Sequence, residues 1–251
     1  MVFFNKNHHI HFKDLYFAGD LIERLGEDCP TKYFKFLGTM IDDQLNWTYH
    51  LLSLKSKLNS ANFALAQIKN SLPLFARKAI YESLGKSHLN FSNIIFGACK
   101  QSLLNNLQST QNKLIRNLAN KKYNCHTDPL YKDLGQIKVT DLIKINRATL
   151  VKKFKIGAVP FSIESLFPYK SDTSEMRIRN DEGNFATNNP GSYKTGLFPI
   201  TEVLKTWNTL PLYYKNIHKL SLLKKSLTEH YLSKYESVCD KLNCYPCQQN
   251  T

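Results

Sequence analysis

The chain has 251 residues, which is enough for one or two domains with a sizeable buried core. Apolar residues make up 42% and charged residues 22%, a balance that excludes the intrinsically disordered class. Ten Gly and nine Pro exclude collagen-like and proline-rich chains. Six Cys are too sparse for a disulfide scaffold and are expected to be reduced thiols.

We expect a protein that is not secreted and has no membrane partner. Residues 1–13 contain no apolar core of the kind a secretory signal needs. The longest uncharged gap around the apolar patch at 93–99 is 13 residues, against about 20 apolar residues for a span. The expected location is intracellular, in the nucleus or the cytoplasm.

The net charge of +14 is unevenly distributed. Residues 1–50 carry 5 Lys or Arg and 7 Asp or Glu, whereas residues 100–155 carry 12 and 3. Such a basic block favours a polyanionic partner, most plausibly nucleic acid. The competing interpretation is a helical surface that lysines keep soluble.

The first 45 residues predict a small antiparallel meander. Residues 1–4, 8–12, 15–17 and 21–25 are apolar or alternating, and Ala18, Gly19 and Asp20 suit a turn. The run at 33–41 is rich in aromatic and β-branched residues, is interrupted by Gly38 and ends at Asp42 and Asp43. We expect most of its aromatic side chains, including Tyr33, Phe34 and Phe36, to lie in the core.

From residue 47 onward the apolar pattern changes to the period of a helix. Leucine-rich positions from Leu51 to Leu72 are spaced alternately by three and four residues, which predicts a helix over 47–71. Further helices are expected at 73–85, 90–99, 101–120, from 127 to Gly135, 139–156, 200–210 and 220–236. Residues 168–196 predict a loop. The helix at 139–156 should turn Lys144, Arg147, Lys152, Lys153 and Lys155 outward.

An ordered series of short motifs resembles non-LTR (LINE-type, jockey-like) retrotransposon reverse transcriptases. Phe36-Leu37-Gly38, Asp42, Leu45, Trp47 and His50 resemble the family's pattern at the end of the palm. Later matches are the following: Tyr81 with His88-Leu89; Leu107, Gln111 and Arg116; His126-Thr127 with Pro129-Leu130; Trp207-Asn208 with Leu210-Pro211; and Ser221-Leu222 with Lys224. The series covers nearly the whole chain.

The resemblance implies an α+β chain that begins after the catalytic half of the polymerase. Residues 1–46 would be a palm remnant with the primer-grip hairpin, and 47–157 the helical thumb and its extension. Residues 158–199 would be an irregular linker and 200–251 a C-terminal helical segment. Nucleic acid, as an RNA or DNA primer–template, is the implied partner, and no small-molecule substrate is expected for this chain alone.

The candidate nucleic-acid contacts come from the motif and from the basic helices. The grip turn would contribute Phe36, Leu37 and Gly38, since a glycine lets the backbone approach a phosphate. The helix ends would contribute the following: Lys113, Arg116, Lys121, Lys122, Lys144, Arg147, Lys152 and Lys155.

We expect no catalytic residue and no cofactor in this chain, although the intact polymerase would use Mg²⁺. Met40-Ile41-Asp42-Asp43 imitates a catalytic carboxylate pair, but it lies within the motif that follows the grip and is interpreted as a turn. Residues 83–127 contain no Asp or Glu that could hold metal.

The tail has a second arrangement with a possible metal interpretation. Cys239, Cys244 and Cys247 include one CxxC spacing, which suits zinc, but no His follows them. We favour incidental tail cysteines and expect no metal site.

Three functions remain open from the sequence. The first is the part of an RNA-directed DNA polymerase that grips primer–template through its backbone. The others are a stand-alone binding module for nucleic acid or protein, derived from such an element, and a truncated relic without function.

The chain alone should not extend a primer, because it lacks the paired carboxylates that two-metal nucleotide transfer needs. A primer-extension assay with Mg²⁺ or Mn²⁺ checks this expectation. Reproducible template-dependent incorporation by the purified chain would refute it.

Overall fold

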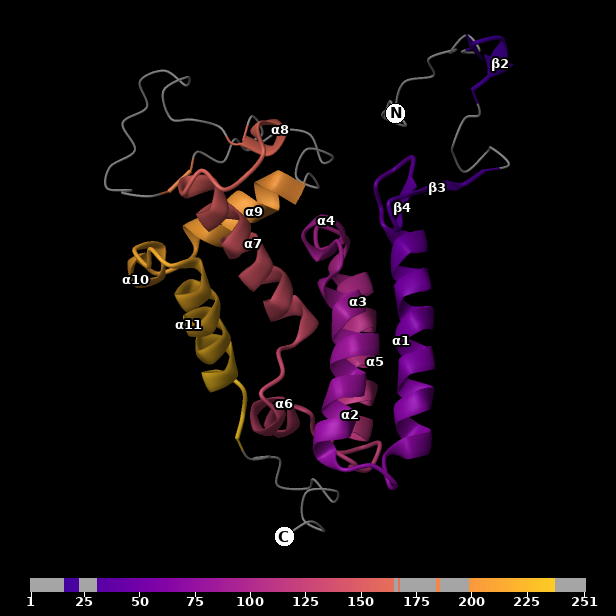
Figure 1. The fold of residues 1–251 in the computed structure, drawn as a ribbon, viewed down its shortest axis with the longest axis vertical. Coiled ribbons are helices and arrows are strands. Elements are labelled where there is room, and N and C mark those ends of the chain that lie inside the picture. The colour runs from indigo at the N-terminus through magenta and orange to yellow at the C-terminus, as the bar shows by residue number, and fades with distance from the viewer. Residues whose placement is uncertain (1–15, 23–30, 165–166, 168–183, 186–198, 238–251) are drawn as a thin grey trace.

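The computed structural model describes residues 16–22, 31–164, 167, 184–185 and 199–237. Two β-hairpins precede a mainly helical body, which confirms the predicted α+β class (Figure 1). The strands predicted at 1–4 and 8–12, the loop predicted at 168–196 except residues 184–185, and the tail cysteines Cys239, Cys244 and Cys247 lie outside the described residues. Within the described ranges, no helix is long and apolar enough to cross a membrane.

The predicted strands pair as two separate hairpins. β1 (Tyr16–Phe17) pairs with β2 (Asp20–Leu21), and β3 (Tyr33–Phe36) pairs with β4 (Thr39–Asp42) with Phe36 opposite Thr39. Leu37 and Gly38 form the two-residue turn of the second hairpin, with φ of 46° and 84°. Two successive positive φ angles match the twist of the strands, and glycine takes the second one without strain.

The second hairpin leads into the long helix α1 (Thr48–Ile68). The Asp42 carboxylate accepts hydrogen bonds from the backbone N–H of Gln44 at 3.1 Å and of Asn46 at 2.8 Å. Asp42 is buried, and these bonds agree with its interpretation as a turn residue.

The next helical run is longer than the sequence predicts. α2 (Leu74–Ile80), the π-helical segment η1 (Tyr81–Lys86) and α3 (Ser87–Asn90) follow one another without a break. We expected the run to stop near Gly85. Instead Gly85 is helical and buried against the Tyr81 ring and Leu114, so its missing side chain serves close packing and not a helix end.

The remaining helices lie close to their predicted ranges. They are α4 (Asn93–Phe96), α5 (Gln101–Leu118), α6 (Asp128–Leu134), α7 (Val139–Lys155), α8 (Phe161–Glu164), α9 (Pro199–Asn208), α10 (Leu212–Lys215) and α11 (Leu220–Ser233). The short helices α8 and α10 were not predicted. α1, the α2–α3 run and α5 lie side by side, while α7 crosses toward α9 and α11 (Figure 1).

The leucine stripe of α1 faces the core, as its spacing predicts. Leu51, Leu54, Leu58 and Leu65 are buried in the core that α1 shares mainly with α5, whereas Ile68 and Leu72, at and beyond the helix end, are half-exposed. The same hydrophobic cluster continues into the C-terminal helices through Val203, Trp207, Leu223 and Leu227.

Replacing Leu58 or Leu65 by Asp should destabilise the fold by several kcal/mol, because each side chain is fully buried. Leu52→Asp is the matched control, since Leu52 lies on the same helix and is 58% exposed. Thermal unfolding measures all three. A Leu58→Asp protein that melts like the parent would contradict the packing of α1.

Candidate nucleic-acid interface

The first helical layer carries almost no negative charge. Residues 44–127 contain eleven Lys or Arg and one acidic residue, Glu82, which forms an ion pair with Lys86 at 3.3 Å. This stretch supplies α1, the α2–α3 run and α5. We call their solvent-exposed side chains the basic layer.

One basic group of this layer lies where α5 ends. Asn120 adopts a left-handed conformation with φ of 53°, and the Lys121 N–H donates to the Arg116 carbonyl at 2.8 Å. This is a Schellman ending, which turns the chain sharply after the helix. The turn positions Lys121 and Lys122 directly beyond the last turn of α5, where Lys113 is also exposed.

Arg116 has a structural contact in this region. Its Nε donates to the Cys125 carbonyl at 2.7 Å and so connects α5 to the loop that follows. The guanidinium is half-buried, and burial lowers its pKa. Of the four basic residues predicted here, Lys113 and Lys122 are exposed, Lys121 is half-exposed, and Arg116 is engaged with the loop.

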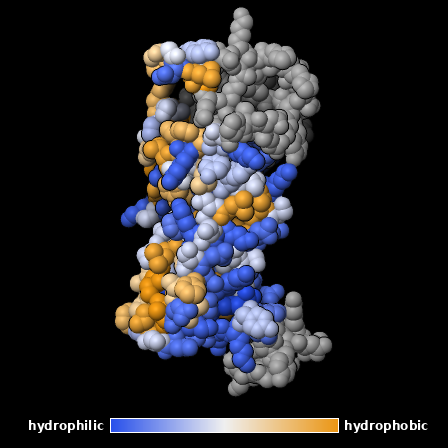
Figure 2. Space-filling view, turned by 90° about the vertical axis from the view of Figure 1, so that its right-hand side faces the viewer, coloured by the Kyte–Doolittle hydropathy of each residue, from blue (hydrophilic) through white to orange (hydrophobic). Residues whose placement is uncertain are grey.

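The layer contains basic residues that sequence reasoning missed. Lys55 and Lys57 are exposed on α1, and Tyr123, beside Lys122, is 88% exposed. Two effects lower the pKa of His88: burial, which is the larger, and the positive charge of Lys57. The absence of acidic residues over 44–81 is the sequence signal that could have identified these lysines as part of a basic surface. Figure 2 looks onto the side that carries α1 and shows hydrophilic residues over much of its lower half.

The predicted grip turn is exposed but lies away from the end of α5. Phe36 is 54% and Leu37 80% exposed. The turn packs beside the α3–α4 junction, since a Cβ on Gly38 would lie 3.2 Å from Phe91 Cζ. α1 has 21 residues and separates the two groups, so they are about 30 Å apart along its axis. The structure does not bring them together.

The expected burial of the hairpin aromatics is wrong. Tyr33 is 40%, Phe34 50% and Phe36 54% exposed. A two-stranded ribbon has two faces, and only part of one face can rest against α1, where Tyr33 stacks near Tyr49.

The predicted outer face of α7 is also partly wrong. Arg147 is 6% and Lys152 5% exposed, because α9 and α11 pack against this helix. Arg147 faces Glu202 at 3.6 Å, and Lys152 donates to the Lys215 carbonyl at 3.4 Å. Both side chains are therefore buried and are not displayed on the outer surface of the helix.

The three other lysines of α7, Lys144, Lys153 and Lys155, are exposed as predicted, and two of them already have neighbours. Lys144 pairs with Asp141 at 2.9 Å and lies over the Tyr231 ring. Lys155 lies 4.9 Å from the centre of the Trp207 ring. Both belong to the α9–α11 side of the molecule and not to the basic layer.

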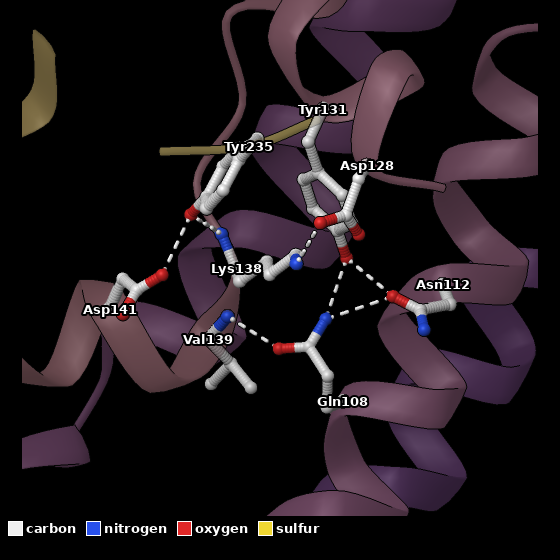
Figure 3. Close-up of polar contacts among 8 residues, drawn as sticks. All are labelled: Gln108, Asn112, Asp128, Tyr131, Lys138, Val139, Asp141 and Tyr235. Carbon is white, nitrogen blue, oxygen red and sulfur yellow. Dashed lines mark hydrogen bonds and ion pairs between the residues drawn. The ribbon is translucent and has the colours of Figure 1, made fainter. Parts of the chain in front are cut away.

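A network of hydrogen bonds joins α5 to η1, α6 and the start of α7. We call it the buried polar anchor and define it as Gln108, Gln111, Tyr81, Tyr131 and the segment 137–139. Two of its members, Tyr81 and Gln111, belong to the motifs that carry the family resemblance. Gln111 donates to Tyr81 Oη at 3.0 Å and to the Ile137 carbonyl at 2.9 Å, and accepts from the Val139 N–H at 2.8 Å. Gln108 also accepts from Val139 and donates to the Tyr131 hydroxyl (Figure 3).

A second group of contacts ties the C-terminal end to the same place. The Tyr235 hydroxyl donates to Asp141 at 2.9 Å and accepts from the Lys138 N–H at 3.0 Å (Figure 3). Lys138 also pairs with Asp128 at 2.7 Å. The start of α7 is therefore held from α5, α6 and the end of α11 together.

The Trp-Asn motif at 207–208 is structural as well. Trp207 is fully buried in the core. Asn208 pairs with the backbone of Phe185, accepting from its N–H at 3.0 Å and donating to its carbonyl at 2.9 Å. The described residues hold no group of three or more His, Cys, Asp or Glu that could bind a metal ion.

Comparison with known proteins gives one relationship. The chain is 25% identical over 132 residues to the RNA-directed DNA polymerase from mobile element jockey of Drosophila funebris. The alignment covers 47% of this chain and 14% of that protein, so the chain spans only a small part of its relative. It supports a distant, reverse-transcriptase-like relationship. No protein-family profile and no solved structure matches the chain.

Replacing Gln111 by Leu should lower the free energy of unfolding by about 2–4 kcal/mol, since the Ile137 carbonyl and the Tyr81 hydroxyl lose their partner. Gln67→Leu on the exposed part of α1 is the control. Chemical denaturation measures both. Equal stability of the two variants would contradict the role given to Gln111.

The buried tyrosines should make the fold sensitive to alkali. Burial raises the pKa of Tyr81 to about 12, so the folded chain keeps a proton that the unfolded chain loses near pH 10. The stabilising contribution is complete below pH 10 and is lost as the pH rises toward 12. Melting temperature followed over this range should fall less steeply in Tyr81→Phe. Parallel profiles for the two proteins would be inconsistent with this assignment.

Proposed function

We propose that the chain binds nucleic acid through the phosphate backbone, as a non-catalytic part of a reverse-transcriptase-like polymerase. The observation that carries the proposal is the charge of residues 44–127, which hold eleven Lys or Arg and a single acid, Glu82. The exposed members of this set include Lys55, Lys57, Lys113 and Lys122. A surface with so few carboxylates repels phosphates little and attracts a polyanion at long range.

The geometry favours backbone contact over base reading. The exposed lysines of the layer lie along α1, on α5 and beyond the end of α5. Lysines act as point charges toward phosphates, and such contacts tolerate any sequence. An RNA–DNA hybrid would be recognised by its shape and its backbone.

The similarity to the jockey polymerase supports the same reading. Within the proposal, the β3–β4 hairpin is the primer grip and the helices 47–157 are the thumb with its extension. Phe36, Leu37 and Gly38 would then contact the primer end, and the lysines at the end of α5 would contact the duplex farther along. Mg²⁺ would belong to the palm of the intact enzyme.

Changing Lys113, Lys121 and Lys122 to Gln should weaken binding to every duplex sequence alike. Each lost phosphate contact should flatten the dependence of log K on log salt by about 0.9. Titrations of a primer–template duplex at about 50 and 200 mM salt measure both effects.

The matched control changes Lys219, Lys224 and Lys225 to Gln, because these exposed lysines lie on the α11 side. The same charge is removed, so a general electrostatic effect would appear in both variants. Equal weakening by the two triple variants, or no binding at low salt, would contradict a contact at the end of α5.

A further inference from the structure

A pocket of about 550 Å³ lies at the opposite end of α5 from Lys121 and Lys122, where the loop into α5 meets α7 and α9. One wall is a single face of α7, with Thr140, Lys144 and Arg147 one or two turns apart. The opposite wall is Cys99 and Gln101, at the start of α5, and Glu202 closes one side. The pocket has the volume that ligand sites commonly have.

Arg147 is a buried cation with unused donors in this wall. Its Nη1 donates weakly to Thr206 Oγ1 at 3.4 Å and faces Glu202 at 3.6 Å. Its Nε and Nη2 are buried and have no hydrogen-bond partner among the described residues. Burying guanidinium donors without partners costs free energy, and a ligand with acceptor oxygens at these donors would offset that cost. Burial also lowers the pKa of Arg147, consistent with its incomplete pairing.

The start of α5 contributes a second set of donors. No side chain caps this helix of 18 residues, and its first turn contains no acidic residue. The N–H groups of Leu103 and Leu104 bond to the Lys100 carbonyl, and those of Gln101 and Ser102 precede the first such bond. An uncapped helix start combines free N–H groups with the positive end of the helix dipole, which together favour an anion.

The acidic residues nearby are already matched by cations. Glu202 pairs with Lys205 at 3.2 Å in addition to Arg147, and Asp141 pairs with Lys144 at 2.9 Å. The three cations Lys144, Arg147 and Lys205 and the two carboxylates Glu202 and Asp141 form these ion pairs, so one positive charge is left over. Of the five, Lys144, Arg147 and Glu202 line the pocket itself.

We propose that this pocket binds a phosphate group, held between the Arg147 guanidinium and the first N–H groups of α5. A tetrahedral anion has enough acceptor oxygens for both sets of donors. The group could belong to free phosphate or to a nucleic-acid backbone that crosses the loop at 97–101. Only the second source rests on the function proposed above.

Gln101→Glu is the discriminating variant. A carboxylate in the first turn of α5 favours the helix, so the folded chain should be at least as stable as the parent. The same carboxylate occupies the place of the anion and repels it. Ser109→Glu is the control, because it adds the same charge at an exposed position about 12 Å farther along α5.

The measurement is a titration of the full chain with inorganic phosphate at constant ionic strength, followed by amide NMR. The proposal predicts saturable shifts of the Gln101 and Ser102 amides and of Arg147 Nε–H. Gln101→Glu should weaken phosphate binding about tenfold or more, and Ser109→Glu should leave it unchanged. Absent or non-saturable shifts, or equal affinity in the Gln101→Glu protein, would overturn the proposal even if the chain binds duplex.

A second titration with a primer–template duplex identifies the source of the phosphate. If the backbone enters the pocket, inorganic phosphate competes with the duplex and Gln101→Glu weakens duplex binding more than Ser109→Glu does. If the pocket takes free phosphate, the two variants bind duplex equally while the phosphate shifts persist. Both results support a phosphate site. Loss of duplex binding in the parent itself would count against the proposed function and not against the pocket.

Discussion

The side-chain amide of Gln111 is the constraint on which the arrangement of the helices most depends. Both of its N–H donors and its carbonyl are used inside the protein, on η1, on the segment before α7 and on the first residue of α7. Buried amides of this kind stabilise one arrangement and penalise others, because any shift leaves donors and acceptors without partners. The start of α7 is thereby fixed against α5, and α9 and α11 pack on α7 in turn.

This anchor explains why the recognisable motifs are scattered yet ordered. Tyr81, Gln111, Trp207 and Asn208 are not neighbours in the chain, but each makes a buried contact between segments. Asp42 likewise shapes the turn between the hairpin and α1. The residues of this pattern therefore support the fold of this chain, and binding contacts have to be sought on the exposed surface between the motifs.

Elements set by local rules could be predicted from the sequence. The leucine spacing defined α1, and Gly135 with φ of 65° ends α6 as expected.

Residues whose environment depends on distant helices could not be predicted. Arg147 and Lys152 follow the polar side of α7, but both are buried because α9 and α11 pack against this helix. Gly85 looked like a helix end and instead provides room for the Tyr81 ring. The hairpin aromatics looked like core residues because aromatic content alone does not say which face of a ribbon is covered.

The candidate interface also combines a feature that the sequence predicts with one that only the fold shows. The charge of the first helical layer is a property of composition and was readable from the sequence. The distance of about 30 Å between the grip turn and the end of α5 required the fold. Because of it, the two groups contact one nucleic acid only if the duplex lies along α1.

Hydrogen exchange of the full chain, with and without a primer–template duplex, tests this placement most directly. The account predicts slower exchange in the β3–β4 hairpin and in the residues around the end of α5, with α11 unchanged. Slower exchange confined to α9–α11, or no change anywhere under conditions where the duplex is bound, would contradict it.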